Sequence, residues 1–344
     1  MFASNLLILP SRSSKSMCFT IKNYQGREPV LNYILYILFL VIVKNITACH
    51  SAAMPSDWVP ELESKHVHIR NPEFVKKAIE HMMKDGAKKL QVVADFDRTL
   101  SKYKHQGQVS ATCHNVLEES HVMPDFFKEQ ATALRDKYIP LEFSHDLTVE
   151  QKIPLMIEWY KAGVAMYVGS GIRSQDVSVS VAKARLVLRD GCMWFFDELH
   201  QHQIPLLIFS AGIGDIIEEV ITQQAHMLDN MKIVSNFMDF DSEGKLIGFK
   251  GEMIHTYNKN ENAVHDSDYF KQLKHHENLI LLGDSLGDLR MAEGAEVTHM
   301  LKIGFLNHHV ETNLKSYMDS FDIVIQEDES MDVVNAILKK ILGQ

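Results

Sequence analysis

The stretch VVADFDRTLS, residues 92–101, decides the fold of this chain. The run LQVVA before Asp95 has no polar alternation, which is typical of a strand that is buried on both faces of a parallel sheet. Asp95 and Asp97 follow where this strand is expected to end. Because ligands of open α/β sheets bind at the carboxyl ends of the strands, two acids at this position indicate a functional site.

Strands that alternate with helices predict an α/β fold, a doubly wound parallel sheet with an inserted, mainly helical cap domain. Further strands are expected at residues 204–210, 232–237, 245–249, 278–285 and 322–326. Helices are expected at 71–85, around 124–138, after Thr148, and at 174–191, 215–227, 268–273, 310–318 and 331–342. The expected domains are a first part of the core at 55–110, the cap at 111–203 and a second part of the core at 204–344.

Residues 1–54 differ in character from the rest and are expected to be a hydrophobic leader or anchor. Their apolar run VLNYILYILFLVIV, residues 30–43, is interrupted only by Asn32. It is short for a membrane span, which needs about 20 residues, and it has the length of a signal h-region. A signal, a short membrane anchor and an optional leader that ends before Met54 all stay open, and membrane contact is expected only through this segment.

Composition narrows the possible partners. The formal net charge is −10 and no dense Lys/Arg stripe is present, which argues against binding to a nucleic-acid polymer. A small phosphate accompanied by a divalent cation is compatible with this charge. The four cysteines, Cys18, Cys49, Cys113 and Cys192, are scattered and form no CxxC pair, so reduced thiols are expected rather than disulfides or a zinc site. We expect a monomer.

Four polar stations follow or connect the expected strands. The first holds Asp95 and Asp97, and the second holds Ser210 and Ala211 in SAGIG, whose glycines let backbone amides approach an anion. The third is Lys259 in the polar loop HTYNKN. The fourth, LGDSLGD at residues 282–288, holds Asp284 and Asp288. Together they supply carboxylates, a hydroxyl, a cation and free amides.

This set of groups suits phosphoryl transfer. A carboxylate can attack a phosphate ester only if cations neutralise the phosphoryl oxygens, and oxygen ligands favour Mg²⁺ as one of these cations. Asp95 would form an aspartyl-phosphate, and Asp97 would protonate the leaving oxygen and then activate water. Ser210, the Ala211 amide and Lys259 would hold the phosphoryl oxygens.

The segments DFDRT, IFSAG, a downstream lysine and LLGDSLGD resemble, in this order, the four motifs of the haloacid dehalogenase superfamily of phosphohydrolases. More narrowly, LTVEQKIPLMIEWY, IPLLIFSAGIGDIIEEVI, KIVSNFMDFD, GFKGE and LKIGFLN resemble the cytosolic 5′-nucleotidase III family. The resemblance runs from about residue 70 to the C-terminus. It implies a cytoplasmic, Mg²⁺-dependent enzyme that hydrolyses a pyrimidine nucleoside 5′-monophosphate such as CMP, or 7-methyl-GMP.

The resemblance also implies a role for each matching position. Asp95 would be nucleophile and metal ligand, Asp97 acid/base with its carbonyl facing the metal, and Asp284 a further ligand, while Asp288 would support the metal's water shell. Ser210, Ala211 and Lys259 would bind phosphate. Glu142 matches the glutamate that recognises the nucleoside, and His114, Trp159 and Tyr160 could line a cationic base.

Two positions depart from the family pattern. Arg98 stands where a neutral residue is usual, so its charge could perturb nearby acids or its side chain could point outward. Gly163 stands where some relatives carry a polar side chain that contacts the base. These departures leave the preferred base open.

Simpler interpretations stand beside the functional ones. The second DFD, residues 239–241, runs into Ser-Glu-Gly and is expected to be a hairpin turn. Ser210 and Asp288 could be helix caps, and Trp159 and Tyr160 could be core residues. A nucleoside phosphotransferase that uses the same intermediate, or a nucleotide-binding protein without catalysis, are the alternative functions.

Overall fold

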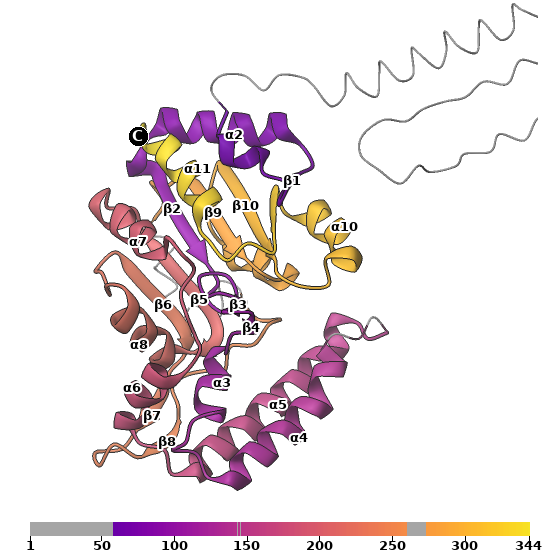
Figure 1. The fold of residues 1–344 in the computed structure, drawn as a ribbon, viewed down its shortest axis with the longest axis vertical. Helices are drawn as coiled ribbons and strands as arrows, with labels where there is room; N and C mark the ends of the chain where they lie inside the picture. Colours follow the sequence, from indigo (N-terminus) through magenta and orange to yellow (C-terminus); the bar gives the residue numbers. More distant parts are fainter. Residues whose placement is uncertain (1–57, 143, 145, 260–272) are drawn as a thin grey trace, which may run out of the picture. The chain divides into compact units, whose positions relative to one another are not determined.

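The computed structural model describes residues 58–142, 144, 146–259 and 273–344, and its main feature is a seven-stranded sheet with β2 (Leu90–Ala94) near the centre (Figure 1). The strand order is β1-β11-β10-β9-β2-β5-β6. The bounds are β1 (Val67–Ile69), β5 (Leu206–Ile213), β6 (Met231–Asn236), β9 (Asn278–Gly283), β10 (His299–Leu306) and β11 (Ile323–Gln326). All neighbours pair in parallel except β1, which pairs antiparallel with β11. The predicted doubly wound parallel sheet is confirmed.

Side chains of β2 alternate between two apolar layers. Val93 packs in one layer with side chains of β5 and β9, of helix α10 (Val310–Ser320) and of the 3₁₀ helix η4 (Leu286–Ala292). Val92 and Ala94 pack in the other, with α2 (Pro72–Asp85), α7 (Cys192–Gln201), α8 (Gly214–Gln224) and α11 (Asp332–Leu342). Burial on both faces explains the continuous apolar run before Asp95.

Four further helices lie between β2 and β5 in the sequence: α3 (Cys113–Glu118), α4 (Asp125–Glu142), α5 (Val149–Ser170) and α6 (Ser174–Lys183). The predicted start of α5 is confirmed, because the Thr148 hydroxyl accepts a bond from the Gln151 amide and the Gln151 side chain accepts one from the Thr148 amide. The helix continues through Pro154. α4 packs along α5 (Figure 1).

The helix predicted at 174–191 is wrong in its length, because α6 ends at Lys183. The following residues form backbone hydrogen bonds with the segment after Asp97 instead. The Ala111 amide donates to the Arg185 carbonyl (3.2 Å), and the Arg189 amide donates to the Leu100 carbonyl (2.9 Å). These long-range bonds satisfy the backbone groups that a longer helix would have paired locally.

The strands differ from the prediction in several places. β1 and β10 were not predicted, and residues 245–249 do not join the main sheet. β8 (Leu246–Phe249) pairs antiparallel with β7 (Met238–Phe240), which was not predicted, so the hairpin is confirmed but Asp239 and Phe240 belong to its first strand rather than to its turn. The Gly244 amide donates to the Asp241 carbonyl in this turn, with Gly244 at φ +76°. A second small sheet pairs β3 (Lys104–His105) with β4 (Gln108–Val109). The helix predicted at 268–273 and the leader at 1–54 lie outside the described residues, apart from Leu273.

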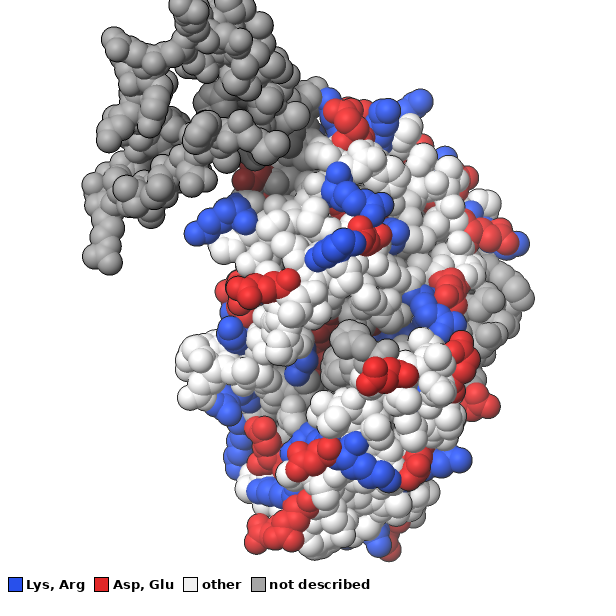
Figure 2. Space-filling view, turned by 90° about the vertical axis from the view of Figure 1, so that its right-hand side faces the viewer, with Lys and Arg blue, Asp and Glu red and all other residues white. Residues whose placement is uncertain are grey.

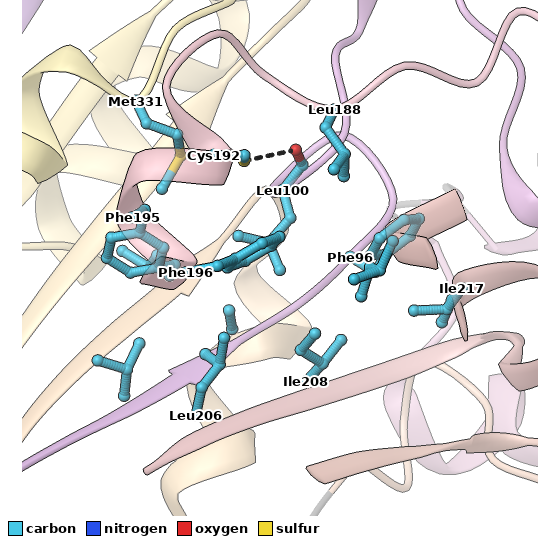
Figure 3. Close-up of a cluster of buried hydrophobic side chains, with 14 of the residues drawn as sticks. Phe96, Leu100, Leu188, Cys192, Phe195, Phe196, Leu206, Ile208, Ile217 and Met331 are labelled. Carbon is cyan, nitrogen blue, oxygen red and sulfur yellow. Dashed lines mark hydrogen bonds between the residues drawn. The ribbon is translucent and has the colours of Figure 1, made fainter. Parts of the chain in front are cut away.

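The larger apolar layer includes aromatic side chains of α7. Figure 3 shows Phe195 and Phe196 beside Leu206 of β5, with Phe96 and Ile208 nearby. Phe96 separates the two acids of DFD and is fully buried. Phe96 packs in this apolar layer directly after the end of β2, and it anchors the loop that carries Asp95 and Asp97 to the core.

The surface carries both signs of charge. On the face in Figure 2, Lys and Arg are interspersed with Asp and Glu over the described residues. None of the helices that the structure describes combines the length and apolar character of a membrane span. Cys113 and Cys192, the two cysteines in the described ranges, are buried free thiols, as predicted.

Arg189 is a fully buried cation that ties the chain after α6 to the loop after β2. Its guanidinium donates to the carbonyls of Thr99 (2.7 Å) and Arg98 (2.7 Å), to the Asn307 side chain (2.9 Å) and to the Asp328 carbonyl. Arg189 therefore binds the loop that carries both acids of DFD at two of its carbonyls, those of Arg98 and Thr99.

Arg189→Met should lower the free energy of unfolding by about 3 kcal/mol, because it leaves several buried acceptors without a donor. The matched control is Arg185→Met, since Arg185 is exposed on the same segment; its effect should stay within about 0.5 kcal/mol. Urea unfolding followed by circular dichroism measures both. Equal stabilities of the two variants would contradict the structural role of Arg189.

Candidate active site

The first and fourth polar stations meet at the carboxyl edge of the sheet. Ala94 of β2 pairs with Leu282 of β9, so Asp95 and Asp284 leave neighbouring strands at the same edge. The Asp95 amide donates to the Leu282 carbonyl at 3.0 Å. One carboxylate oxygen from each of Asp95, Asp284 and Asp288 lies within 4.8 Å of the others. The structure thus brings three of the four predicted acids into one cluster.

Lys259 lies inside this cluster. Its ammonium nitrogen is 2.5 Å from Asp95 Oδ1 and 2.9 Å from Asp288 Oδ1. The exposed fractions of the three side chains are 7% for Lys259, 5% for Asp95 and 2% for Asp288. A loop that follows the small β7–β8 sheet therefore delivers a buried cation to an acid that follows β2.

Asp288 caps η4, as one of its two sequence interpretations predicted, and it also contacts Lys259. Its Oδ2 accepts bonds from the Asp284 amide (3.1 Å), the Ser285 amide (2.9 Å) and the Ser285 hydroxyl (2.9 Å). These bonds cap the N-terminus of η4. Its Oδ1 is left for Lys259. Gly283 makes room for this arrangement, because a Cβ there would lie 2.6 Å from Asp288 Cβ.

Asp97 lies next to the second station. Its Oδ1 accepts a bond from the Cys113 amide at 2.9 Å, at the start of α3. A Cβ on Gly212 would lie 3.2 Å from Asp97 Oδ2, so glycine allows the SAG segment to approach this acid. Burial raises the pKa of Asp97, and the bonds from Cys113 lower it in part. A raised pKa suits a carboxyl group that must carry a proton to a leaving oxygen.

The cluster holds more negative than positive charge. Burial raises the pKa of Asp95 to about 7, Asp288 adds to the increase, and Lys259 opposes it. Burial, with the charges of Asp95 and Asp288, raises the pKa of Asp284 well above its usual range. At Lys259 burial disfavours the charged form, but the two aspartates outweigh burial and raise its pKa.

These carboxylates fit a divalent cation. All the clustered donors are oxygens, the type of ligand that Mg²⁺ takes in proteins, usually with only one or two carboxylates and several waters. A bound divalent cation would also relieve the repulsion that raises the pKa values of Asp95 and Asp284.

Ser210 and Ala211 interrupt the regular pairing of β5. The register between β5 and β6 shifts between Phe209 and Ile213, and the Ser210 hydroxyl accepts a bond from the Gly212 amide at 3.0 Å. Helix α8 begins at Gly214 without a side-chain cap, so the helix-cap interpretation of Ser210 is wrong. The irregular stretch frees backbone groups at the edge where Asp95 and Asp97 lie.

Asn236, a residue that the sequence analysis missed, connects the second and third stations. Its side chain is 2% exposed and donates to the carbonyls of Ala211 (2.9 Å) and Ile254 (2.9 Å). Its Oδ1 accepts a bond from the Ile254 amide at 2.8 Å. Asn236 ends β6 at the same sheet edge, so the strand-end rule applied to β6 would have found it.

Glu142 reaches the same loop from the end of α4. Its Oε1 accepts a bond from the Thr256 hydroxyl at 2.9 Å, and its carbonyl accepts one from the Tyr257 hydroxyl at 3.1 Å. Burial raises the pKa of Glu142, while the Thr256 bond and the charges of Lys152 and Arg98 lower it. Glu142 therefore contacts the start of the short segment 256–259, and Lys259 is the last residue of that segment.

The three predicted aromatic residues differ in their distance from this region. The Tyr160 hydroxyl lies 3.5 Å from the Ala211 carbonyl, and the His114 ring meets the Tyr160 ring edge-on at 6.2 Å. The Trp159 ring instead stacks on Tyr138 of α4 at 5.6 Å. Tyr160 and His114 thus lie near the second station, while Trp159 joins α4 to α5.

The two departures from the family pattern have distinct surroundings. Gly163 lies in α5 with open space where a side chain would begin, since nothing lies within 4 Å of its ideal Cβ. Arg98 adopts the left-handed conformation, with φ +65°, and its guanidinium lies 5.3 Å from the centre of the Tyr103 ring.

With this geometry established, similarity to known proteins identifies the family. Residues 98–342 match the family described as pyrimidine 5′-nucleotidase (UMPH-1). The chain belongs to the pyrimidine 5′-nucleotidase family. The predicted resemblance is thereby confirmed, and it covers most of the chain after the first strand of the site.

Relatives of this pyrimidine 5′-nucleotidase family member cover nearly the same range. The human 7-methylguanosine phosphate-specific 5′-nucleotidase is 44% identical over 287 residues, which are 83% of this chain and 96% of the relative. The Xenopus laevis 7-methylguanosine phosphate-specific 5′-nucleotidase A is 43% identical over 282 residues, 82% of this chain and 97% of the relative. The crystal structure of cytosolic 5′-nucleotidase IIIB bound to cytidine is similar with a TM-score of 0.76 and 34% identity, covering 82% of this chain and 96% of that one.

In this 5′-nucleotidase family member, Asn236→Ala should weaken the binding of inorganic phosphate about tenfold, because the Ala211 carbonyl and the loop to Lys259 lose their common support. Calorimetric titration in the presence of Mg²⁺ measures the affinity. Asn230→Ala is the matched control, since Asn230 donates to the Ile204 carbonyl (2.8 Å) next to the other end of β5. Phosphate affinity equal to that of the control would contradict the role of Asn236.

Proposed function

We propose that this chain is a Mg²⁺-dependent phosphohydrolase that converts nucleoside 5′-monophosphates to nucleoside and phosphate. The observation that carries the proposal is the contact of Lys259 with Asp95 inside a buried cluster of carboxylates. A structural ion pair alone does not need two further acids at the same sheet edge. Membership of the pyrimidine 5′-nucleotidase family and the names of the relatives support the same reaction.

Asp95 is the nucleophile in this proposal. Its carboxylate oxygen attacks the phosphorus atom, and the bond from phosphorus to the 5′ oxygen breaks as the aspartyl-phosphate forms. Asp97 gives its proton to the leaving 5′ oxygen, which releases the nucleoside. Asp97 then takes a proton from water, and the hydroxide formed attacks phosphorus, which releases phosphate and restores Asp95.

The remaining groups of the site hold charge in place. Bound Mg²⁺, held by Asp95 and Asp284 with the Asp97 carbonyl, would neutralise phosphoryl oxygens during the transfer. Asp288 would orient its water shell. Lys259, the Ser210 hydroxyl and the Ala211 amide would bind the phosphoryl oxygens. Lys259 is already positioned by Asp95 and Asp288, so little reorganisation is needed.

The inserted helices would form the cap that selects the nucleoside. Glu142 accepts a hydrogen bond from Thr256 in the loop of Lys259, and it would also accept hydrogen bonds from a cytosine amino group or a 7-methylguanine edge. Tyr160 and His114 would line the base, with Trp159 behind them on Tyr138. One relative is named for 7-methylguanosine phosphate and another was crystallised with cytidine, so both bases belong to the proposed substrate range.

The proposed location is the cytoplasm, in line with the word cytosolic in the name of the structural relative. The proposed substrate is a small nucleotide rather than a nucleic-acid polymer, in keeping with the mixed charges of the surface. We expect the chain to act as a monomer.

Asp95→Asn should lower phosphate release at least about 1,000-fold without unfolding the protein, because the attacking carboxylate is lost. Phosphate release from CMP, UMP, GMP, AMP and 7-methyl-GMP is measured with Mg²⁺ and again with EDTA, which should stop the wild-type reaction. Asp239→Asn changes the second DFD and should leave the rate unchanged. Wild-type protein that releases no phosphate from any of the five would refute the proposed function in favour of nucleotide binding alone.

Glu142→Gln should lower kcat/KM about tenfold for the preferred nucleotide, because an amide accepts from a cationic or amino-bearing base less strongly than a carboxylate does. The rate with p-nitrophenyl phosphate, which has no base, should change little. Glu129→Gln, on an exposed face of the same helix, is the control. Equal losses with both substrates would show that Glu142 does not recognise the base.

A further inference from the structure

Arg98 places a second cation beside the site, one that the mechanism above does not use. It follows the acid/base Asp97 directly in the sequence. Among the described residues it forms no ion pair with a carboxylate, and its Nε is buried without a hydrogen-bond partner. A guanidinium is always charged and offers five donors in a planar fork, so unused donors here call for an acceptor.

The backbone of Arg98 is held on both sides. Its amide donates to the Ser101 hydroxyl at 2.8 Å, and its carbonyl accepts bonds from Arg189 (2.7 Å) and Asn307 (3.0 Å). These bonds keep Arg98 at φ +65°, a left-handed conformation that disfavours residues other than glycine by about 1 kcal/mol. A backbone fixed in this way sets the direction in which the side chain leaves the loop.

An aromatic pair then orients the guanidinium. Arg98 Cζ lies 5.3 Å from the centre of the Tyr103 ring, and that ring stacks on the His308 ring at 5.2 Å. Such a contact attracts the cation without using its N–H donors, and the buried Nε of Arg98 has no hydrogen-bond partner.

The charge of Arg98 reaches both ends of the site. Burial raises the pKa of three carboxyl groups, and Arg98 opposes the increase at each of them. They are Asp97 and Asp284 at the sheet edge and Glu142 at the end of α4. A substrate that extends from the sheet edge to Glu142 would therefore pass within the field of Arg98.

We propose that Arg98 is a substrate-binding residue whose guanidinium binds the phosphate group of the nucleotide. The proposal rests on the proposed function. The same positive charge repels a divalent cation from the cluster of Asp95, Asp284 and Asp288, so Arg98 has effects of opposite sign on the two ligands. It strengthens the binding of phosphate and weakens the binding of metal to the free protein.

The test compares Arg98→Met, Arg98→Lys and the control Lys104→Met. Met and Lys carry a Cβ as Arg does, so the backbone strain at φ +65° is retained. Lys104 is exposed and its ammonium lies 5.6 Å from the same Tyr103 ring, so the control removes the same charge from the other end of the ring system. The measurements are KM for the nucleotide that the wild type hydrolyses, the inhibition constant of inorganic phosphate, and Mg²⁺ affinity by calorimetry without substrate.

Arg98→Met should raise KM and the inhibition constant of phosphate about tenfold, with a smaller change in kcat, and should tighten Mg²⁺ binding about threefold. Arg98→Lys should recover part of the phosphate affinity and the wild-type Mg²⁺ affinity. Lys104→Met should change none of these values more than about twofold.

Phosphate inhibition that is unchanged in Arg98→Met would overturn the proposal, provided that the wild type turns over its substrate. Loss of both phosphate affinity and Mg²⁺ affinity in both Arg98 variants would also overturn it. A disturbed loop weakens the binding of both ligands, whereas the loss of the positive charge weakens phosphate binding and strengthens Mg²⁺ binding. A wild type without turnover would refute the proposed function instead. In that case the phosphate affinities of wild type and Arg98→Met, measured by calorimetry, still decide the role of Arg98.

Discussion

The buried ammonium of Lys259 between Asp95 and Asp288 is the contact on which the site depends. An isolated charge in this position would be strongly unfavourable, so each of the three groups is tolerated only because the others are present. That requirement joins three distant parts of the chain: the end of β2, the start of η4 and the loop after β8. The chain must bring these parts together before any of the buried charges is compensated. The site therefore affects the stability of the fold as well as the chemistry.

The parts that could be predicted from sequence are those in which local patterns and chemistry agree. The apolar run of β2, followed by Asp95 and Asp97, specifies a buried strand and the position of the acids at once. The same reasoning predicted Asp284 at the end of β9, which the structure confirms, and Ser210 at the end of β5, which in fact continues to Ile213. Because neighbouring parallel strands end at the same edge of the sheet, residues that follow different strands lie close together there.

The rest depends on contacts between residues far apart in the sequence. α6 ends at Lys183 because the backbone that follows it forms hydrogen bonds with distant residues such as Leu100. No pattern within residues 174–191 predicts these long-range hydrogen bonds. Glu142 meets Thr256 across 114 residues, a contact set by how the inserted helices return to the sheet. β10 escaped prediction because its first residues, HMLK, mix polar and apolar side chains, and only its pairing with β9 and β11 makes it a central strand. Asn236 is different, since its signal at the end of β6 was present and the rule was not applied to it.

Two arginines act on the loop after β2 in different ways, and their connection explains why an arginine in a strained conformation is tolerated beside Asp97. Arg189 is fully buried and donates to the Arg98 carbonyl, and this bond holds Arg98 at φ +65°. Asn307 binds the same carbonyl, which leaves the peptide little freedom to relax. The left-handed conformation is thus determined by the core rather than by the residue that adopts it, and a glycine would fit it with less strain. Because the backbone is already fixed by these bonds, the side chain at position 98 sets the charge of the loop while the core sets its shape.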